Sequence, residues 1–235
     1  MKMLIREDPS CYVSLEQQQL LHELAGIQLI KENFFLTGGT ALSVFYLHHR
    51  TSEDIDLFTK NDVDLGILDQ ILKRTYKDGI SLVQSAPMFL SYLIKNIKVD
   101  IVIDPLTEEC ERDNITLKIG NRINIDTIDN ISSNKLTTMV SRFEIKDLVD
   151  FYCISKEAWD FSEAIFMDCY KKARKKEALL DDPAAAAYQI EQTLEFAQAI
   201  IDNFKPMMKK PIVWVELEST IKKYIQIIYN FQEWR

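Results

Sequence analysis

The feature that most constrains the fold is a change in sequence pattern near residue 130. Before it, short runs rich in β-branched residues alternate with amphipathic segments, and all six glycines occur there. After it, only helical periods of apolar residues occur, and glycine is absent from residue 131 onward. A chain of 235 residues is long enough for two domains. We therefore predict an α+β domain over residues 1–130, followed by a helical domain over residues 131–235.

The spacing of apolar residues predicts the individual elements. In the first domain we expect helices over 14–31, 40–46 and 63–77, with Thr40 near the N-cap of the second. Strands are expected over 33–37, 52–58, 80–85, 88–95 and 98–103, with a weak hairpin signal over 115–125. Helices of the second domain are expected over 130–142, 144–156, 159–176, 183–204 and 211–231.

Composition excludes several classes of protein. Hydrophobic residues make up 47% of the chain and charged residues 27%, an ordinary globular balance that argues against disorder. The formal net charge of −8 excludes a generally basic coat for nucleic acid, although not a local basic patch. Residues 1–130 hold 13 Lys/Arg and 20 Asp/Glu, whereas residues 131–235 hold 15 and 16, so the first domain carries nearly all the excess acid.

Cysteine usage and the N-terminal sequence indicate a compartment. The four cysteines are scattered and form no Cys-x-x-Cys pair, which predicts reduced thiols and no structural zinc site. Charged residues interrupt the first residues of the chain, and no apolar run approaches the ~18 residues of a membrane span. We therefore expect no signal peptide, no membrane segment and a cytoplasmic protein.

Two nearby strands are expected to carry carboxylates. Asp54 and Asp56 are two residues apart on a predicted strand, which places both on the same face. Asp100 interrupts an otherwise apolar strand, where a charge requires a partner or a metal. If the strands are neighbours, the three carboxylates offer the hard oxygen ligands that suit Mg²⁺ or Mn²⁺. The alternative for Asp54 and Asp56 is a solvated edge-strand face.

A glycine pair lies between a predicted strand and the helix that follows it. Gly38 and Gly39 allow backbone N–H groups to approach a phosphate, and a helix N-terminus adds a favourable dipole. Many such pairs are only turns, so an ordinary turn remains the alternative.

These residues form a recognisable pattern. Gly-Gly-Thr-Ala-Leu at 38–42 and His-Arg-Thr-Ser-Glu-Asp-Ile-Asp-Leu-Phe at 49–58 resemble the first motif of the AbiEii/AbiGii nucleotidyltransferase toxins of abortive-infection systems. These toxins belong to the polymerase-β-like nucleotidyltransferase superfamily. A later strand Asp of the family is matched by Asp100, and a helical Lys-Leu by 135–136. An Arg-Asp-x-x-Asp-like element is matched by 146–150, with Lys146 where Arg is common.

The resemblance implies the fold, the reaction and the site. We expect a mixed β-sheet flanked by helices, followed by a C-terminal helical bundle, and metal-dependent transfer of a nucleoside monophosphate (NMP) from a nucleoside triphosphate (NTP) to a hydroxyl. Asp54, Asp56 and Asp100 would hold the metals. The residues that would contact the nucleotide are Gly38, Gly39, Thr40, Arg50, Ser52 and Lys135. Asp147 would orient Lys135 or assist proton transfer. Without the resemblance, Lys135 and Asp147 are read as a surface lysine and a helix-surface ion pair.

The resemblance also implies partners. Toxins of this type are thought to act on tRNA, and a cognate antitoxin is expected. Three basic clusters in the helical domain could contact RNA phosphates or could simply be solvated helix ends: 171–176, Lys205 with 209–210, and 222–223. The other functions that we consider are a non-catalytic nucleotide-binding module and a protein-interaction module on the same fold.

Overall fold

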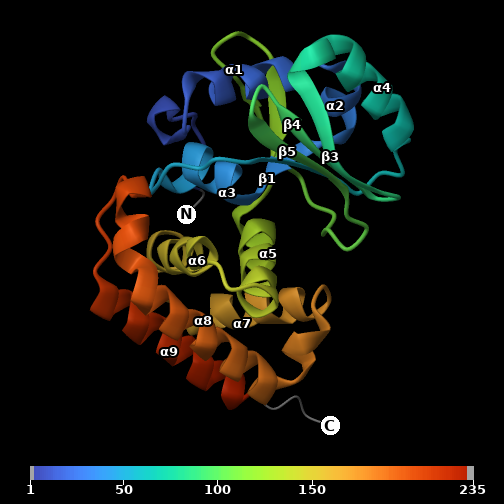
Figure 1. The fold of residues 1–235 in the computed structure, drawn as a ribbon. Coiled ribbons are helices and arrows are strands. Elements are labelled where there is room, and N and C mark those ends of the chain that lie inside the picture. Colours follow the sequence, from blue (N-terminus) through green and yellow to red (C-terminus); the bar gives the residue numbers. More distant parts are fainter. Residues whose placement is uncertain (1–2, 232–235) are drawn as a thin grey trace. The chain divides into compact units, whose positions relative to one another are not determined.

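A computed structural model describes residues 3–231 of the chain. It contains two compact units, Met1–Thr127 and Ile128–Arg235 (Figure 1). The first unit contains a β-sheet and helices, and the elements of the second unit are helical. The fold therefore confirms the predicted α+β class with a helical C-terminal region.

The first unit is built on a mixed sheet with the strand order β3-β4-β5-β2-β1-β7-β6. The pairs β2–β5 and β1–β7 are parallel, and the other neighbouring pairs are antiparallel. The strands are β1 Phe35–Thr37, β2 Ile55–Thr59, β3 Ile80–Ala86, β4 Phe89–Ile94, β5 Ile97–Ile103, β6 Asp113–Thr116 and β7 Arg122–Ile125.

The two central parallel strands have one buried face and one less covered face. Ile55 and Leu57 of β2 are fully buried, as are Val99 and Ile101 of β5. Side chains alternate between the faces of a sheet, so the intervening residues of both strands share the opposite face. Burial of the apolar residues fixes the register, because a slip by one residue would turn them toward water.

Helices α1, α2 and α4 lie beside this sheet (Figure 1). The single helix expected over 14–31 is wrong: the structure has α1 Leu15–Leu24 and α2 Gln28–Asn33, with a break between them. At the break, Gly26 packs against Asn121, whose side-chain amide donates to the His22 carbonyl over 2.9 Å. A Cβ at Gly26 would lie 2.8 Å from that amide nitrogen. The third helix, α4 Leu65–Tyr76, begins with Asp64 as N-cap.

The helix after β1 begins earlier than the sequence predicts. The short α3 Gly38–Thr40 continues directly into the π-helix η2 Ala41–Leu47, so the helix begins at Gly38 and its N-cap is Thr37. Thr40, which is expected near the N-cap, is the third residue of this helix, and its hydroxyl bonds to the segment that precedes β2. π-helical turns are rare in proteins, and those that occur are often located at functional sites.

The second unit consists of packed helices around an aromatic core. Phe166 stacks on Tyr224 with ring centroids 4.1 Å apart, and Phe151 meets Trp159 edge-on at 5.3 Å. The Tyr224 hydroxyl is hydrogen-bonded to Ser155. The helices are α5 Ile128–Ser141, α6 Ile145–Glu157, α7 Glu163–Arg174, α8 Pro183–Phe204 and α9 Trp214–Tyr229.

Helix length and hydropathy bear on whether the chain can cross a membrane. Within residues 3–231, no helix combines the length and the apolar character that a membrane span requires.

Candidate active site

The structure places carboxylates of β2 and β5 on one face of the sheet. Asp56 pairs directly with Asp100 in the parallel ladder, and directly paired residues of neighbouring strands share a face. Asp54 precedes β2 by one residue and lies two residues before Asp56. All three side chains are half-buried, in contrast to the fully buried apolar residues of the opposite face. We call these three residues the acidic face.

Two neighbours hold Asp100 in place. The Ser91 hydroxyl on β4 donates to Asp100 Oδ1 over 2.6 Å, and the Lys98 ammonium donates to Asp100 Oδ2 over 2.6 Å. Burial lowers the pKa of Lys98, but its bond to Asp100 and the charges of Asp100, Asp54 and Asp56 outweigh this and raise it. The Lys98 side chain is 47% exposed, so this cation partner of Asp100 also reaches solvent.

The glycine pair fits tightly between the acidic face and a buried arginine. Gly38 has φ +67°, a left-handed conformation, and a Cβ there would lie 2.1 Å from Asp56 Oδ2. A Cβ at Gly39 would lie 2.7 Å from Arg50 Nη2 and 3.0 Å from Ser52 Oγ. Both glycines are therefore required sterically, because their backbone occupies the space between Asp56 and Arg50.

Arg50, Ser52 and Thr40 form a buried layer behind the glycine pair. All three are at most 4% exposed. The Thr40 hydroxyl donates to Ser52 Oγ over 3.0 Å and also contacts the Asp54 carbonyl oxygen. Arg50 Nη1 donates to the Thr51 carbonyl over 2.7 Å. These bonds join the start of the helix to the segment that leads into β2, and so position Asp54 and Asp56.

A second buried carboxylate supports the end of β1. The Thr37 hydroxyl donates to Asp126 Oδ2 over 2.7 Å, and Arg112 Nε lies 3.1 Å from Asp126 Oδ1. The Tyr46 hydroxyl donates to the Asp126 carbonyl over 2.7 Å. Since Thr37 directly precedes Gly38, these contacts hold the turn from β1 into the helix.

The predicted residues of the helical unit lie in a buried charge cluster. Lys135 Nζ is 2.8 Å from Asp147 Oδ1 and 2.7 Å from Asp150 Oδ2. Arg142 contacts Asp147 through two nitrogens, Nε at 2.7 Å and Nη2 at 3.1 Å. Asp147 and Asp150 are fully buried, and the Lys135 side chain is 7% exposed. We call these four residues the charge cluster: Lys135, Arg142, Asp147 and Asp150. Their two positive and two negative formal charges cancel.

The electrostatics of this cluster stabilise the ionised form of Asp147. Burial by itself raises the pKa of Asp147, but the Lys135 ammonium and the Arg142 guanidinium outweigh it and hold the pKa below its ordinary value. Asp147 is therefore not a carboxylate on the helix surface, even though it pairs with Arg142. Sequence reasoning assigned no role to Asp150. Its i, i+3 spacing from Asp147, which places both on one face of α6, was the available signal.

Most cations of the three basic clusters have partners in the same unit. Lys172, Arg174, Lys205, Lys210, Lys222 and Lys223 each lie within 4.0 Å of a carboxylate. Lys176 donates to the side-chain oxygens of Asn130 and Asn134, over 2.7 and 2.6 Å. Lys171, Lys175 and Lys209 are exposed. The clusters are therefore mixed-charge surfaces rather than bare cationic patches, and an RNA phosphate would compete with carboxylates there.

A mixed sheet with paired carboxylates on adjacent strands and a glycine turn against one of them defines a nucleotidyltransferase-type domain. The chain belongs to the AbiEii nucleotidyltransferase toxin family: the family model described as "Nucleotidyl transferase AbiEii toxin, Type IV TA system" matches residues 19–217. The match includes the acidic face, the glycine pair and the charge cluster. Curated protein sequences give no match to the chain.

Solved structures agree with the family on the fold. A putative nucleotidyltransferase from H. pylori is 19% identical, has a TM-score of 0.50, and the match covers 92% of this chain and 96% of that one. MenT4, a nucleotidyltransferase toxin from Mycobacterium tuberculosis, is 13% identical with a TM-score of 0.51, covering 93% of this chain and 83% of that one. At these identities the likeness is one of fold alone.

These comparisons confirm the predicted family, fold and enzyme class. The chain is a nucleotidyltransferase of a type IV toxin–antitoxin family. The roles of the individual site residues, the domain limits, the metal and the RNA acceptor stay predictions.

Proposed function

We propose that this nucleotidyltransferase transfers an NMP from an NTP to a hydroxyl of RNA, with the acidic face as the metal centre. The observation that carries the proposal is the direct pairing of Asp56 with Asp100, next to a glycine whose backbone contacts the Asp56 carboxylate. In the reaction, the acceptor oxygen bonds to the α-phosphorus, the bond to the β-phosphate bridging oxygen breaks, and pyrophosphate leaves. The acceptor hydroxyl releases its proton to solvent.

The donor type of the acidic face suits a divalent cation. Its donors are all carboxylate oxygens, the ligands that Mg²⁺ and Mn²⁺ prefer. A cation, the Lys98 ammonium, already lies 2.6 Å from Asp100 Oδ2. Asp54, Asp56 and Asp100 would hold the metal, which when bound would lower the pKa of the acceptor hydroxyl and stabilise charge on the departing pyrophosphate.

The glycine turn and the layer behind it have separate roles in this proposal. Gly38 and Gly39 leave room for phosphate oxygens to approach backbone N–H groups at the start of the helix. Thr40, Arg50 and Ser52 were expected to contact the nucleotide directly. Their burial and their mutual bonds favour a positioning role instead, in which they hold the glycine backbone and the Asp54 segment in place.

Lys135 and Asp147 are proposed to act as a unit. Lys135 carries the charge that would neutralise a phosphate, and Asp147 with Asp150 holds its ammonium at a defined position. Contact with a phosphate requires Lys135 to exchange one carboxylate partner for a phosphate oxygen. Arg142 would then continue to neutralise Asp147 through its two nitrogens.

The RNA acceptor, with tRNA as the first choice, is supported by membership of a toxin family and by the exposed lysines of the basic clusters. A cognate antitoxin is proposed on the same family grounds. We expect the enzyme to act in the cytoplasm, where NTP and tRNA are available.

The test is to incubate the protein with each α-³²P-labelled NTP, Mg²⁺ or Mn²⁺, and total RNA. Parallel reactions contain cell protein or small-molecule acceptors. An Asp54→Ala/Asp56→Ala variant with unchanged circular dichroism is the control. Label in RNA with the wild type alone supports the proposal. Label in another acceptor class would identify that class, and not RNA, as the acceptor. Equal labelling by the two proteins refutes catalysis by the acidic face.

The toxin function has an independent test. Expression of the wild type should arrest growth, and the same double substitution should relieve the arrest. Growth arrest that persists with the double variant at equal protein level would separate toxicity from nucleotidyl transfer.

A further inference from the structure

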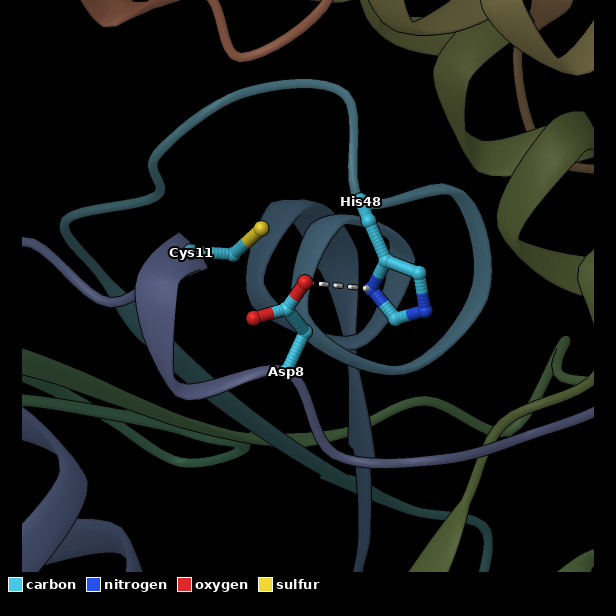
Figure 2. A group of neighbouring side chains, drawn as sticks. All are labelled: Asp8, Cys11 and His48. Atoms are coloured by element: carbon cyan, nitrogen blue, oxygen red, sulfur yellow. Dashed lines mark ion pairs between the residues drawn. The ribbon is translucent and has the colours of Figure 1, made fainter.

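A second group of potential metal ligands lies in the N-terminal unit, apart from the acidic face. Asp8, Cys11 and His48 each offer one ligand atom, and these atoms lie within 4.8 Å of one another (Figure 2). Asp8 caps the short helix η1 Pro9–Cys11, and His48 ends η2 in a left-handed conformation with φ 51°. None of the three belongs to the proposed nucleotide or metal site described above.

The donor atoms differ in kind from those of the acidic face. This group offers one oxygen, one sulfur and one nitrogen, whereas the acidic face offers oxygen alone. Mixed donors of this type suit Zn²⁺, whereas hard cations such as Mg²⁺ favour oxygen. Bonds of about 2.0–2.3 Å place the ligands of a tetrahedral zinc roughly 3.3–3.8 Å apart, so small side-chain rotations would close the group around an ion.

The imidazole of His48 points into this group without a hydrogen-bond partner. His48 Nδ1 is buried and forms no hydrogen bond with the described part of the chain. The nearest charged atom is Asp8 Oδ2 at 3.9 Å, which is too long for a hydrogen bond (Figure 2). A buried ring nitrogen without a partner is unfavourable, and a bound metal ion would satisfy it.

Backbone hydrogen bonds hold both segments of the group in place. Asp8 N donates to the Val44 carbonyl over 2.8 Å, and Ser52 N donates to the Cys11 carbonyl over 3.0 Å. His48 N donates to the Ser43 carbonyl over 3.0 Å. The ligand positions are therefore set by the fold, and partial exposure of Asp8 and His48 leaves an approach for an ion.

We propose that Asp8, Cys11 and His48 bind a Zn²⁺ ion that stabilises the segment from His48 to Ser52. Three protein ligands leave a fourth position for water. The segment carries Arg50 and Ser52, which pack against Gly39. The ion would therefore hold these two residues in position behind the glycine turn. The sequence predicts no zinc site, because Cys11 and His48 are far apart along the chain and meet only after folding.

The experiment measures metal content and Co²⁺ spectra of the full-length chain. Protein is loaded with ZnCl₂, passed through a desalting column and analysed for bound zinc. Co²⁺ loading then tests for a sulfur-to-metal absorption band in the near ultraviolet. The variants are Cys11→Ser and Asp8→Asn. Asp8 is partly exposed, and Asn has the same size as Asp. The matched control is Cys110→Ser, which removes an exposed thiol outside the group.

The proposal predicts about one zinc per chain in the wild type and in Cys110→Ser, at least tenfold weaker binding in Asp8→Asn, and no Co²⁺–sulfur band in Cys11→Ser. Zn²⁺ at about a hundredfold excess over its dissociation constant should raise the wild-type Tm by roughly 5 °C or more. Zinc content below a tenth of an equivalent overturns the site. Equal zinc content and equal affinity in the wild type, Cys11→Ser and Asp8→Asn also overturn it, because the ion would then be bound elsewhere.

Discussion

The acidic face and the charge cluster both gather carboxylates, but they neutralise them differently. The acidic face has three carboxylates on a half-covered side of the sheet, with a half-exposed lysine beside Asp100. The charge cluster has two carboxylates that are fully buried and held by Lys135 and Arg142. The acidic face is therefore partly open to solvent and to an external ligand, whereas the carboxylates of the charge cluster are enclosed and paired with cations of the same unit.

Because its carboxylates are only half-buried, we expect the acidic face, and not the charge cluster, to accept an external ligand. Carboxylates close together without enough internal cations repel each other and attract metal ions, at a cost in stability. Carboxylates paired in the interior stabilise a local conformation, and removing one partner leaves an uncompensated charge. Substitutions in the acidic face should therefore reduce activity with little change in stability, and those in the charge cluster should reduce stability.

The largest expected effect is on activity and comes from the acidic face. Asp56→Asn should reduce the rate of NMP transfer about a thousandfold. A bound metal stabilises the transition state by several kcal/mol, and each 1.36 kcal/mol lost lowers the rate about tenfold. Its free energy of unfolding should stay within about 1 kcal/mol of the wild type, since Asn keeps the size of Asp and the side chain is only half-buried. Initial rates and urea unfolding check both statements.

Glu53→Gln is the matched control for this prediction, because Glu53 is exposed in the same loop. A loss of activity in this variant comparable with that of Asp56→Asn would show that the loop charge in general matters, and not the acidic face.

The next largest effect is on stability and comes from the charge cluster. Asp147→Asn should lower the free energy of unfolding by about 3–5 kcal/mol, because Lys135 and Arg142 lose a buried partner. Urea unfolding at neutral pH measures this. Glu144→Gln is the control, since Glu144 contacts Arg142 from a position that is 38% exposed. Equal stability of the wild type and Asp147→Asn would contradict a structural role for the cluster.

The stability difference should depend on pH. The pKa of Asp147 is lowered in the folded state below its ordinary value of 3.8, so its contribution is present above pH 3.8. As the pH falls through the lowered folded value, the carboxylate becomes protonated in both states and the contribution is lost. The gap between wild type and Asp147→Asn should therefore shrink in urea titrations below pH 3.8. A constant gap would assign the effect to packing.

A smaller effect is expected from the glycine turn. Gly38→Ala would place a Cβ 2.1 Å from Asp56 Oδ2, so the carboxylate must move. Displacement of a catalytic group by about 1 Å can cost about a hundredfold in rate. Gly120→Ala is the control, because Gly120 also has a positive φ of +90° but an added Cβ there would meet no atom within 4 Å. Similar rates for the two variants would show that backbone strain, not the carboxylate position, explains the loss.

The smallest effect concerns the cation beside Asp100. Lys98→Met removes a competing cation, so the Mg²⁺ concentration for half-maximal activity should fall by up to about fivefold, as expected for a half-exposed ion pair of about 1 kcal/mol or less. Lys95→Met is the control: it removes a similarly exposed lysine, which pairs with Glu23 at 2.8 Å. An increased Mg²⁺ requirement in Lys98→Met alone would indicate that Lys98 supports the metal site.

Much of the fold could be predicted from periodicity in the sequence. The strands around Asp56 and Asp100 alternate apolar and polar residues, and helix α8 begins at a proline, so both are visible locally. The packing at the break between α1 and α2 cannot be predicted locally, because Gly26 contacts Asn121, which is nearly a hundred residues away. The early start of the helix at Gly38 also depends on tertiary contacts, since Thr40 bonds to the Ser52 segment instead of capping.

The candidate site shows the same division. Strand geometry predicts a shared face for Asp54 and Asp56, but Asp54 lies one residue before β2, and the pairing of Asp56 with Asp100 depends on strand order, which local patterns do not determine. Spacing does not reveal the burial of Arg50 behind Gly39 or the two carboxylates on Lys135, because these contacts join separate elements. The group of Asp8, Cys11 and His48 was invisible for the same reason.

The central claim is that the acidic face binds the catalytic metal, and a metal-specificity switch at Asp56 tests it most directly. Asp56→Cys replaces a hard oxygen ligand with a softer sulfur ligand. NMP transfer to RNA by wild type and variant is measured with Mg²⁺, Mn²⁺ and Cd²⁺ in turn. We predict that the rate of NMP transfer by the variant with Mg²⁺ is about a thousandfold below that of the wild type. With Cd²⁺ in place of Mg²⁺, the ratio of the variant rate to the wild-type rate should rise at least about tenfold. An equal loss with every metal would contradict the claim.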